Sequence, residues 1–268
     1  MGILNVTPDS FSDGGAWASA DAAISHGIEL AAHGADIVDV GGESTRPGAQ
    51  RVSGDEELSR VIPVIEALTA AGIVTSIDTM RAATARAAVA AGASIVNDVS
   101  GGAADPDMAA AVAALGTDFV AMHWRAHSTE MDAADHYEDV VSEVRHELDS
   151  RVAALTAAGV DPSKIILDPG LGFAKVTDNN WPLLARIEDW SGGHRVLVGA
   201  SRKRFLGAAI ERAGVAADDP AAREHATTAV TALAAAAGVW AVRVHDARSA
   251  ADAIAVTSAW IKGADRSR

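Results

Sequence analysis

The stretch HGADIVDVGG, residues 33–42, contains the unit from which the whole chain is built. Gly34 stands where a helix must stop and the chain must turn back. The apolar run 37–40 has the length of a buried strand, and a glycine pair opens the polar loop after it. Strands that are covered on both faces are continuous apolar runs, so this stretch indicates a parallel sheet packed against helices.

The same pattern recurs along the chain, with glycines before apolar runs in AAGIV, AAGAS and TAAGV. The predicted strands are 1–6, 37–40, 73–77, 94–97, 119–122, 164–167, 195–198 and 240–244. The segments between them have helical spacing, and Ser53 with Glu56 forms a capping box for one helix, which Pro63 should bend. Eight strand–helix repeats without a dividing linker predict an α/β fold, a (β/α)8 TIM barrel, as a single domain over residues 1–268.

Composition narrows the functional classes. The 268 residues are 49% hydrophobic, enough to bury a large core. The absence of cysteine excludes disulfides, thiolate zinc sites and cysteine nucleophiles, and it fits a reducing cytoplasm. No apolar run approaches the roughly 20 residues that span a bilayer. A formal net charge of −14 argues against nucleic acid or an anionic membrane as partner, so an anionic ligand requires a local concentration of cations.

Polar side chains gather at the carboxyl ends of the predicted strands, where barrels place their active sites. They are Asn5, the loop GGESTRPG (41–48), Asp78, Asn97, Asp98, His123, Asp168, Ser201, Lys203, Arg243 and His245, together with the apolar Met122. Several have a plainer reading: a lone Asp after a strand is usually a helix cap, Asp98 suits a turn, and Met122 suits the core. The spacing of His123, His127 and His136 matches no common metal-ligand pattern.

The gathering of several charged side chains at one face of the barrel favours a ligand site. Arg243 and His245 are two residues apart on a strand, so they point the same way, and a buried arginine there needs an anion. Lys203 and Arg46 would approach the same rim. The carboxylates of Asp78 and Asp168, which follow the third and sixth predicted strands, then face these cations. Together they predict a ligand with a polar, proton-donating head and an anionic tail.

Seven ordered motifs resemble those of the dihydropteroate synthase family. They are NVTPDSFSDGG, DVGGESTRPG, SIDT, VNDVSG, DPGLGF, SRKRFLG and VRVH, and they cover essentially the whole chain. The family is a (β/α)8 barrel that joins 6-hydroxymethyl-7,8-dihydropterin diphosphate to 4-aminobenzoate and releases diphosphate. This step belongs to folate biosynthesis and is the target of sulfonamides. The resemblance implies the same reaction here, in a homodimer formed through the later helices. The composition, as described above, predicts a cytoplasmic location.

The resemblance implies a pterin pocket made of Asp78, Asn97, Asp168 and Lys203, with Met122 against the ring. Asp168 would accept two N–H bonds from the amino-pyrimidinone edge, and Lys203 would donate to the carbonyl side of the ring. Phe173 and Pro47 would be walls of the aminobenzoate pocket. Arg204 follows Lys203 where some members have a serine near the benzoate carboxylate.

The resemblance also implies a diphosphate end, made of Asn5, Thr45, Arg46, Arg243 and His245. Asn5 would lend an oxygen to Mg²⁺, an ion that takes few protein ligands besides phosphate oxygens, and Asp13 would lie on a segment that closes over it. The implied catalytic residues are Asp13, Arg46, Asp78, Lys203 and Arg243. In a dissociative substitution Asp78 would stabilise positive charge on the pterin methylene, while the cations and Mg²⁺ stabilise the departing diphosphate.

Three alternatives are weighed against this interpretation. A pterin-dependent methyltransferase shares the barrel but has no use for the diphosphate-binding motifs STRPG, SRK and VRVH. A non-catalytic pterin-binding paralogue should have lost Asn5, Arg46 or Lys203, and all three are present. A phosphate-binding barrel of sugar metabolism should carry a glycine-rich turn after the last strand, where this chain has VHDARSA.

Overall fold

A computed structural model describes residues 1–7, 15–43, 52–125, 135–175 and 178–265. Its eight strands form one sheet in the order β1 to β8, and every neighbouring pair is parallel. The strands are β1 Gly2–Asn5, β2 Val38–Gly41, β3 Thr75–Asp78, β4 Ile95–Asp98, β5 Asp118–Met122, β6 Ile165–Asp168, β7 Arg195–Val198 and β8 Ala241–Val242. A bridge between Gly2 and Val244 joins the two ends of the sheet, so the predicted barrel is confirmed.

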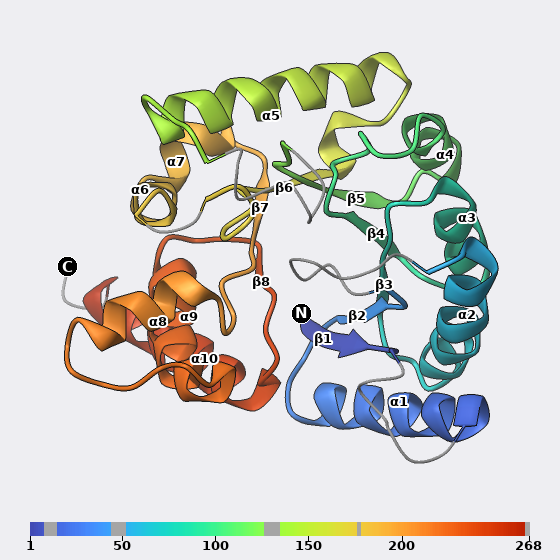
Figure 1. Ribbon diagram of the computed structural model, residues 1–268, viewed down its shortest axis with the longest axis horizontal. Helices are drawn as coiled ribbons and strands as arrows, with labels where there is room; N and C mark the ends of the chain where they lie inside the picture. The colour runs from blue at the N-terminus through green and yellow to red at the C-terminus, as the bar shows by residue number, and fades with distance from the viewer. Residues whose placement is uncertain (8–14, 44–51, 126–134, 176–177, 266–268) are drawn as a thin grey trace.

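Helices form the outer layer of the barrel (Figure 1). They are α1 Gly15–Ala32, α2 Gly54–Ala70, α3 Ala82–Ala90, α4 Met108–Leu115, α5 Val140–Ala157, α6 Asn180–Ala185, α7 Ile187–Ser191, α8 Arg204–Glu211, α9 Glu224–Ala236 and α10 Ala247–Asp265, with the 3-10 helices η3 Pro162–Lys164 and η4 Pro220–Arg223. None of the helices in the described ranges is both long enough and apolar enough to cross a membrane.

Local sequence signals explain where the helices begin and end. The four glycines that precede predicted strands have φ of 96°, 76°, 113° and 99°, a conformation that glycine adopts without steric cost; they are Gly34, Gly72, Gly92 and Gly159. At the start of α2 the Ser53 hydroxyl accepts from the Glu56 amide at 3.2 Å. The Glu56 carboxylate pairs with Arg60, and α2 continues through Pro63.

Two apolar clusters hold the barrel. The larger one lies between strands and helices and includes Leu4, Val40, Ile77 and Phe119. The smaller one groups Met1 with the strand residues Ile95, Val120, Ile166 and Leu197. The carboxyl ends are left to polar side chains.

The strand boundaries differ from the prediction by one to two residues at most ends, and β8 is the strand that is shortened most. The predicted strand 240–244 is reduced to Ala241–Val242. Its ladder nevertheless continues, because the Arg243 amide donates to the Val198 carbonyl at 2.9 Å and the Val244 amide donates to Met1 at 3.0 Å. The backbone on both sides of Arg243 is therefore fixed by strands β7 and β1.

Candidate active site

The strand register places several of the predicted site residues in one layer. Asn5 is the partner of Gly41, Gly41 of Asp78, and Asp78 of Asn97, across four consecutive strands. Gly41 has no side chain, and a Cβ built there would lie 3.7 Å from Asp78 Oδ2 and 3.9 Å from Asn5 Oδ1. The Asn5 and Asp78 side chains therefore approach each other over a bare glycine.

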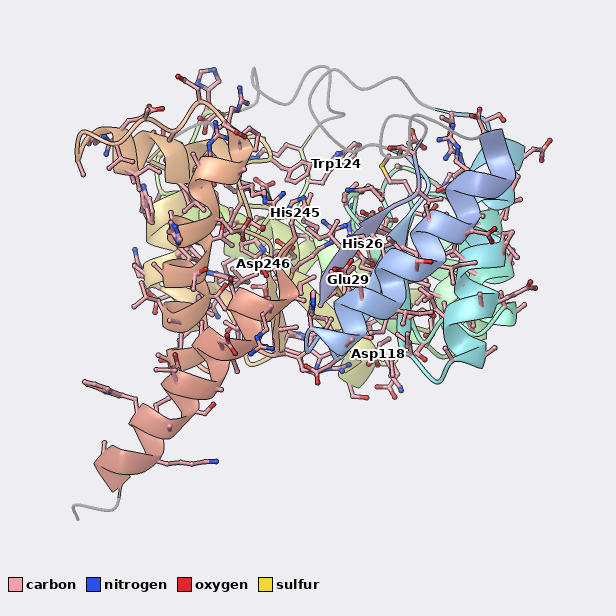
Figure 2. The ribbon with its side chains drawn as sticks, turned by 90° about the horizontal axis from the view of Figure 1, so that it is seen from below. His26, Glu29, Asp118, Trp124, His245 and Asp246 are labelled. Atoms are coloured by element: carbon pink, nitrogen blue, oxygen red, sulfur yellow. The ribbon has the colours of Figure 1, made fainter. Side chains whose placement is uncertain are left out.

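The orientation of the barrel is visible from the side. In Figure 2, Asp118 at the start of β5 and Trp124 just after its end lie at opposite ends of the barrel, with His245 on the Trp124 side. Asp78 ends β3 and Asn97 is the next-to-last residue of β4, so their layer belongs to the same carboxyl end of the barrel as Trp124.

Beneath this layer Arg243 joins two carboxylates. Its Nε donates to Asp39 Oδ2 at 2.6 Å, and a terminal guanidinium nitrogen donates to Asp78 Oδ2 at 2.9 Å. Asn97 Nδ2 donates to the same Asp39 oxygen at 2.9 Å. The anion that a buried arginine requires is therefore supplied by the protein itself, and Asp39 holds Arg243 and Asn97 in fixed relation to Asp78.

Charge in this cluster is not balanced. Asp39 and Asp78 are both buried against the single guanidinium of Arg243. Burial raises the pKa of Asp78 to about 7, Arg243 opposes the shift, and Asp39 adds to it. A group that develops positive charge beside Asp78 would relieve this excess of negative charge.

A second polar pair, Asp168 and Lys203, lies near the carboxyl ends of β6 and β7. Asp168 ends β6, and one of its oxygens, Oδ1, accepts from the Gly170 amide at 2.7 Å. A Cβ built on Gly199 would lie 3.6 Å from Asp168 Oδ2 and 3.8 Å from Lys203 Nζ. Burial raises the pKa of Asp168, with Lys203 opposing, and burial lowers the pKa of Lys203 to about 8, with Asp168 opposing. The carboxylate and the ammonium thus both lie next to the bare backbone of Gly199.

Met122 and Phe173 supply apolar surface beside this pair. Met122 ends β5, is the register partner of Asp168, and is 5% exposed. Phe173 lies in the turn after β6, with its ring centroid 4.8 Å from Lys203 Nζ. Lys203 also donates to the Leu171 carbonyl in the same turn. Arg204 is exposed at the start of α8.

Ser201 holds His245 at the carboxyl end of the barrel. The Ser201 hydroxyl accepts from the His245 amide at 3.2 Å, and the same oxygen lies 2.9 Å from His245 Nδ1. These two contacts fix the position of the imidazole, whose ring nitrogens can donate a hydrogen bond to an anion.

The remaining predictions divide into three groups. Asp13, Thr45, Arg46 and Pro47 lie outside the described residues, as does His127. Asp98 accepts from the amides of Ser100 and Gly102 at 2.7 and 3.0 Å, which agrees with its interpretation as a turn residue. The ranges that the structure describes contain no cluster of three His, Asp or Glu side chains that could hold a metal unaided.

Sequence reasoning missed Asp39 and Lys175. Asp39 interrupts the apolar run IVDV at a buried position two residues before Gly41, and this buried charge was a usable signal. Lys175 directly follows the motif DPGLGF and is 1% exposed, although lysine is rarely buried.

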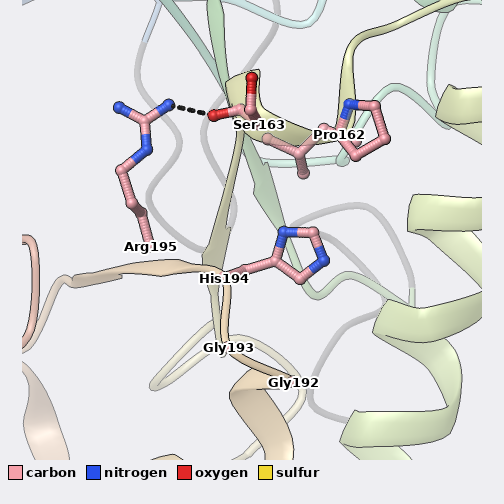
Figure 3. Close-up of a pocket in the computed structure, with 7 residues that line it drawn as sticks. Pro162, Ser163, Gly192, Gly193, His194 and Arg195 are labelled. Atoms are coloured by element: carbon pink, nitrogen blue, oxygen red, sulfur yellow. Dashed lines mark hydrogen bonds between the residues drawn. The ribbon is translucent and has the colours of Figure 1, made fainter.

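A pocket of about 330 Å³ lies near the opposite end of the barrel, beside η3 and the start of β7 (Figure 3). Arg195 there donates to both oxygens of Asp118 at 2.8 and 3.0 Å and to the Ser163 carbonyl at 2.9 Å. Its charge is thus already paired, and none of the predicted site residues lines this pocket.

Sequence comparison agrees with the geometry. The model of the pterin binding enzyme family matches residues 1–245. Dihydropteroate synthase of Mycobacterium leprae (strain TN) is 53% identical over 263 residues, which cover 97% of this chain and 93% of that protein. Dihydropteroate synthase of Bacillus subtilis (strain 168) is 46% identical over 253 residues, covering 94% and 84%.

Solved structures give the same result. Xanthomonas albilineans dihydropteroate synthase with 4-aminobenzoic acid has a TM-score of 0.88 at 45% identity, covering 97% of this chain and 91% of that one. The same enzyme in complex with 7,8-dihydropteroate has a TM-score of 0.85 at 43% identity, covering 97% of this chain and 92% of that one. Yersinia pestis dihydropteroate synthase in a sulfonamide complex has a TM-score of 0.88 at 37% identity, covering 98% of this chain and 94% of that one. The chain therefore belongs to the dihydropteroate synthase family of pterin-binding enzymes.

Proposed function

We propose that this protein condenses 6-hydroxymethyl-7,8-dihydropterin diphosphate with 4-aminobenzoate to give 7,8-dihydropteroate and diphosphate, the sulfonamide-sensitive step of folate biosynthesis. The observation that carries the proposal is the polar end of the barrel, where Asp168 and Lys203 both lie next to the bare backbone of Gly199. Asp78 and Asn97 lie in one register layer at the same end. Such an arrangement suits a heterocycle with donors along one edge and a carbonyl beside them.

The pterin ring is assigned to the side of Asp168. A carboxylate accepts two parallel N–H bonds from an amino-pyrimidinone edge, and Lys203 donates to the carbonyl of the ring. Asn97 adds an amide whose orientation is set by its bond to Asp39. Met122 packs against the ring, and Phe173 forms a wall of the aminobenzoate pocket together with Pro47.

The chemical step assigns charge stabilisation to Asp78. As the bond to diphosphate stretches, positive charge develops on the pterin methylene, and the carboxylate of Asp78 stabilises it. The neutral amine of 4-aminobenzoate then attacks the methylene and loses a proton, so no strong base is needed. Arg243 holds Asp78 in place through a 2.9 Å bond and, with His245, adds positive potential at the diphosphate end.

The diphosphate end of the substrate is assigned to Asn5, Thr45, Arg46, Arg243 and His245, and Asp13 lies on the segment that follows Asn5. The Asn5 side chain ends near Asp78 and offers one neutral oxygen, which suits Mg²⁺, an ion that retains waters and binds substrate phosphates. When bound, Mg²⁺ would supply positive charge to the leaving diphosphate. Thorough removal of divalent ions with EDTA should abolish activity, and full activity after chelation would remove the metal from the proposal.

The assembly is proposed to be a homodimer through α9 and α10. These two helices pack together and carry three large apolar side chains that are strongly exposed: Leu233 at 71%, Val256 at 68% and Trp260 at 81%. Exposed apolar surface of this kind is typical of a subunit interface. Light scattering should give a dimer for the parent chain and a monomer for Trp260→Asp; a monomeric parent would contradict the assignment. A cytoplasmic location is part of the proposal and is supported by the cysteine-free composition, which suits a reducing compartment.

The direct test is diphosphate release from the pterin diphosphate with and without 4-aminobenzoate. We expect release that requires the amine and is inhibited by a sulfonamide. Release at the same rate without 4-aminobenzoate would indicate a hydrolase and overturn the proposal.

A further inference from the structure

The turn after β6 is built around a buried lysine. Gly170, Gly172 and Ala174 have φ of 67°, 73° and 50°, so the chain coils back on itself between Asp168 and Lys175. Lys175 Nζ lies 3.2 Å from the Gly170 carbonyl, 3.1 Å from the Phe173 carbonyl and 2.9 Å from His123 Nδ1. Three acceptors match the three protons of an ammonium group.

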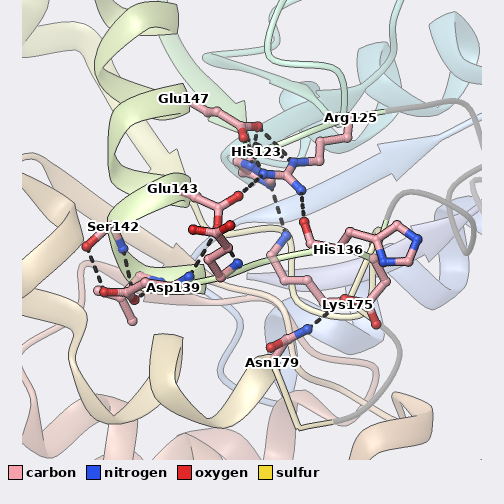
Figure 4. Close-up of polar contacts among 12 residues, drawn as sticks. His123, Arg125, His136, Asp139, Ser142, Glu143, Glu147, Lys175 and Asn179 are labelled. Carbon is pink, nitrogen blue, oxygen red and sulfur yellow. Dashed lines mark hydrogen bonds and ion pairs between the residues drawn. The ribbon is translucent and has the colours of Figure 1, made fainter.

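His123 continues this contact toward α5 (Figure 4). Its Nε2 lies 2.9 Å from Glu147 Oε2, and Arg125 Nε donates to both oxygens of Glu147 at 3.1 Å. Burial lowers the pKa of Lys175 to about 7, with Asp168 opposing. In its ammonium form Lys175 only donates, so His123 accepts at Nδ1 and donates from Nε2. Burial lowers the pKa of His123 to about 4, and Lys175 acts in the same direction. A neutral imidazole thus bridges a buried cation and a carboxylate that is itself paired with Arg125.

The same turn contacts the proposed substrate pocket. Its Phe173 ring lies 4.8 Å from Lys203 Nζ. On the opposite side the turn is held by Lys175 and by Asn180, whose Oδ1 accepts from the Gly172 amide at 2.7 Å. The Phe173 carbonyl accepts a hydrogen bond directly from Lys175. Asp168 and Asn97 sit on strands β6 and β4, and Lys175 reaches Asp168 only through its charge and through Gly170, which accepts from Lys175 and donates to Asp168. Loss of Lys175 should therefore disturb Phe173 more than the pterin contacts.

We propose that Lys175 is a positioning residue for the aminobenzoate pocket, which it acts on by fixing the Phe173 backbone and tying it through His123 and Glu147 to α5. The inference rests on the proposed function, because it uses the assignment of Phe173 to that pocket. Lys175 itself touches no substrate. Lys175 sets the position of the Phe173 ring, so it affects the binding of 4-aminobenzoate and not that of the pterin diphosphate.

The test is Lys175→Met, which keeps an unbranched side chain one atom shorter than lysine and removes all three donors. We expect the KM for 4-aminobenzoate to rise by about 10-fold or more, because small displacements of a binding group are felt strongly. The KM for the pterin diphosphate and kcat should stay within about 3-fold. Lys164→Met is the matched control: this lysine is 44% exposed at the other end of β6, near Asp118, and its loss should change none of the three parameters.

A second variant and a second measurement keep the test decisive if Lys175→Met fails to fold. Glu147→Gln retains the carbonyl bonds of Lys175 but removes the charge that orients His123, so it should raise the same KM by about 3-fold. In the ligand-free protein, hydrogen exchange at the Phe173 amide, which donates to Gly170 at 3.0 Å, should be faster in both variants and unchanged in Lys164→Met.

The outcomes separate the two proposals. A parent protein that releases no diphosphate contradicts the proposed function, and the exchange measurement then still decides whether Lys175 fixes the turn. Unchanged exchange at Phe173 overturns the positioning role whatever the activity. An equal rise in the KM of both substrates also overturns it, because it would show a general loosening of the barrel end.

Discussion

Replacement of Asp78 by asparagine should remove activity and at the same time make the folded protein less sensitive to rising pH. Asparagine has the same shape and keeps an acceptor for Arg243, which lies 2.9 Å from Asp78 Oδ2. It lacks the charge that is buried beside Asp39. The substitution therefore isolates the free energy of ionising Asp78 within the folded barrel.

The magnitude follows from linkage. An aspartate carboxyl ordinarily has a pKa of 3.8, and burial raises the pKa of Asp78 in the folded protein to about 7. Between these values the Asp78 carboxyl keeps its proton in the folded state and has lost it in the unfolded state. The contribution of Asp78 to stability is therefore fully present below pH 3.8 and is lost as pH rises to about 7. In this range each pH unit changes the free energy of unfolding by about 1.4 kcal/mol. Two of these units lie between pH 5 and 7, so Asp78 should lower the free energy of unfolding by about 3 kcal/mol between pH 5 and pH 8.

Urea unfolding of the parent and of Asp78→Asn at pH 5 and pH 8 measures this effect. Titratable groups that do not interact with Asp78 are present in both proteins and cancel in the difference. We expect Asp78→Asn to gain about 3 kcal/mol relative to the parent on going from pH 5 to pH 8. A relative stability that is the same at both pH values would refute the reasoning, because Asp78 would then not be held in a medium that penalises its charge.

Three further predictions concern the mouth of the barrel. Asp168→Asn should weaken pterin binding by about 2 to 5 kcal/mol in titration calorimetry, because the charge-assisted pair is lost; an unchanged Kd with lower thermal stability would favour a helix-capping role instead. Gly199→Ala places a methyl group 3.6 Å from Asp168 Oδ2 and 3.8 Å from Lys203 Nζ, so pterin binding should weaken by about 1 to 3 kcal/mol while the Tm stays the same; normal affinity would show that no ligand occupies this space. Arg243→Ala should lower the free energy of unfolding by about 3 kcal/mol at pH 8, since Asp39 loses its cation, and denaturant unfolding with no loss would contradict the pairing.

Much of the fold was accessible from local sequence signals. The helix-ending glycines, the apolar runs and the polar residues after them predicted the barrel and the end at which its site lies, because each signal acts within a few residues. The extent of β8 was not predicted correctly, since its ladder depends on bonds to Val198 and Met1 that no local pattern encodes.

Pairing across the barrel was beyond reach for a related reason. The sequence indicated that Arg243 needs an anion, and the structure supplies Asp39, 204 positions away along the chain. Strand register decides that Asp39 and Arg243 face each other, and register cannot be read from either segment alone. The role of Lys175 was missed for a different reason. Two of its acceptors are carbonyls of its own turn, which only the coiled backbone of that turn brings to Nζ, and the third is an imidazole from the end of β5.

The central claim is the condensation itself, and identification of its product tests it most directly. The purified protein is mixed with 6-hydroxymethyl-7,8-dihydropterin diphosphate, 4-aminobenzoate and Mg²⁺, and both products are quantified, the pterin product by mass spectrometry and the diphosphate by an enzyme-coupled assay. We predict 7,8-dihydropteroate and diphosphate in equal amounts, each appearing only when 4-aminobenzoate is present. Diphosphate accompanied by free 6-hydroxymethyl-7,8-dihydropterin and no dihydropteroate would contradict the account.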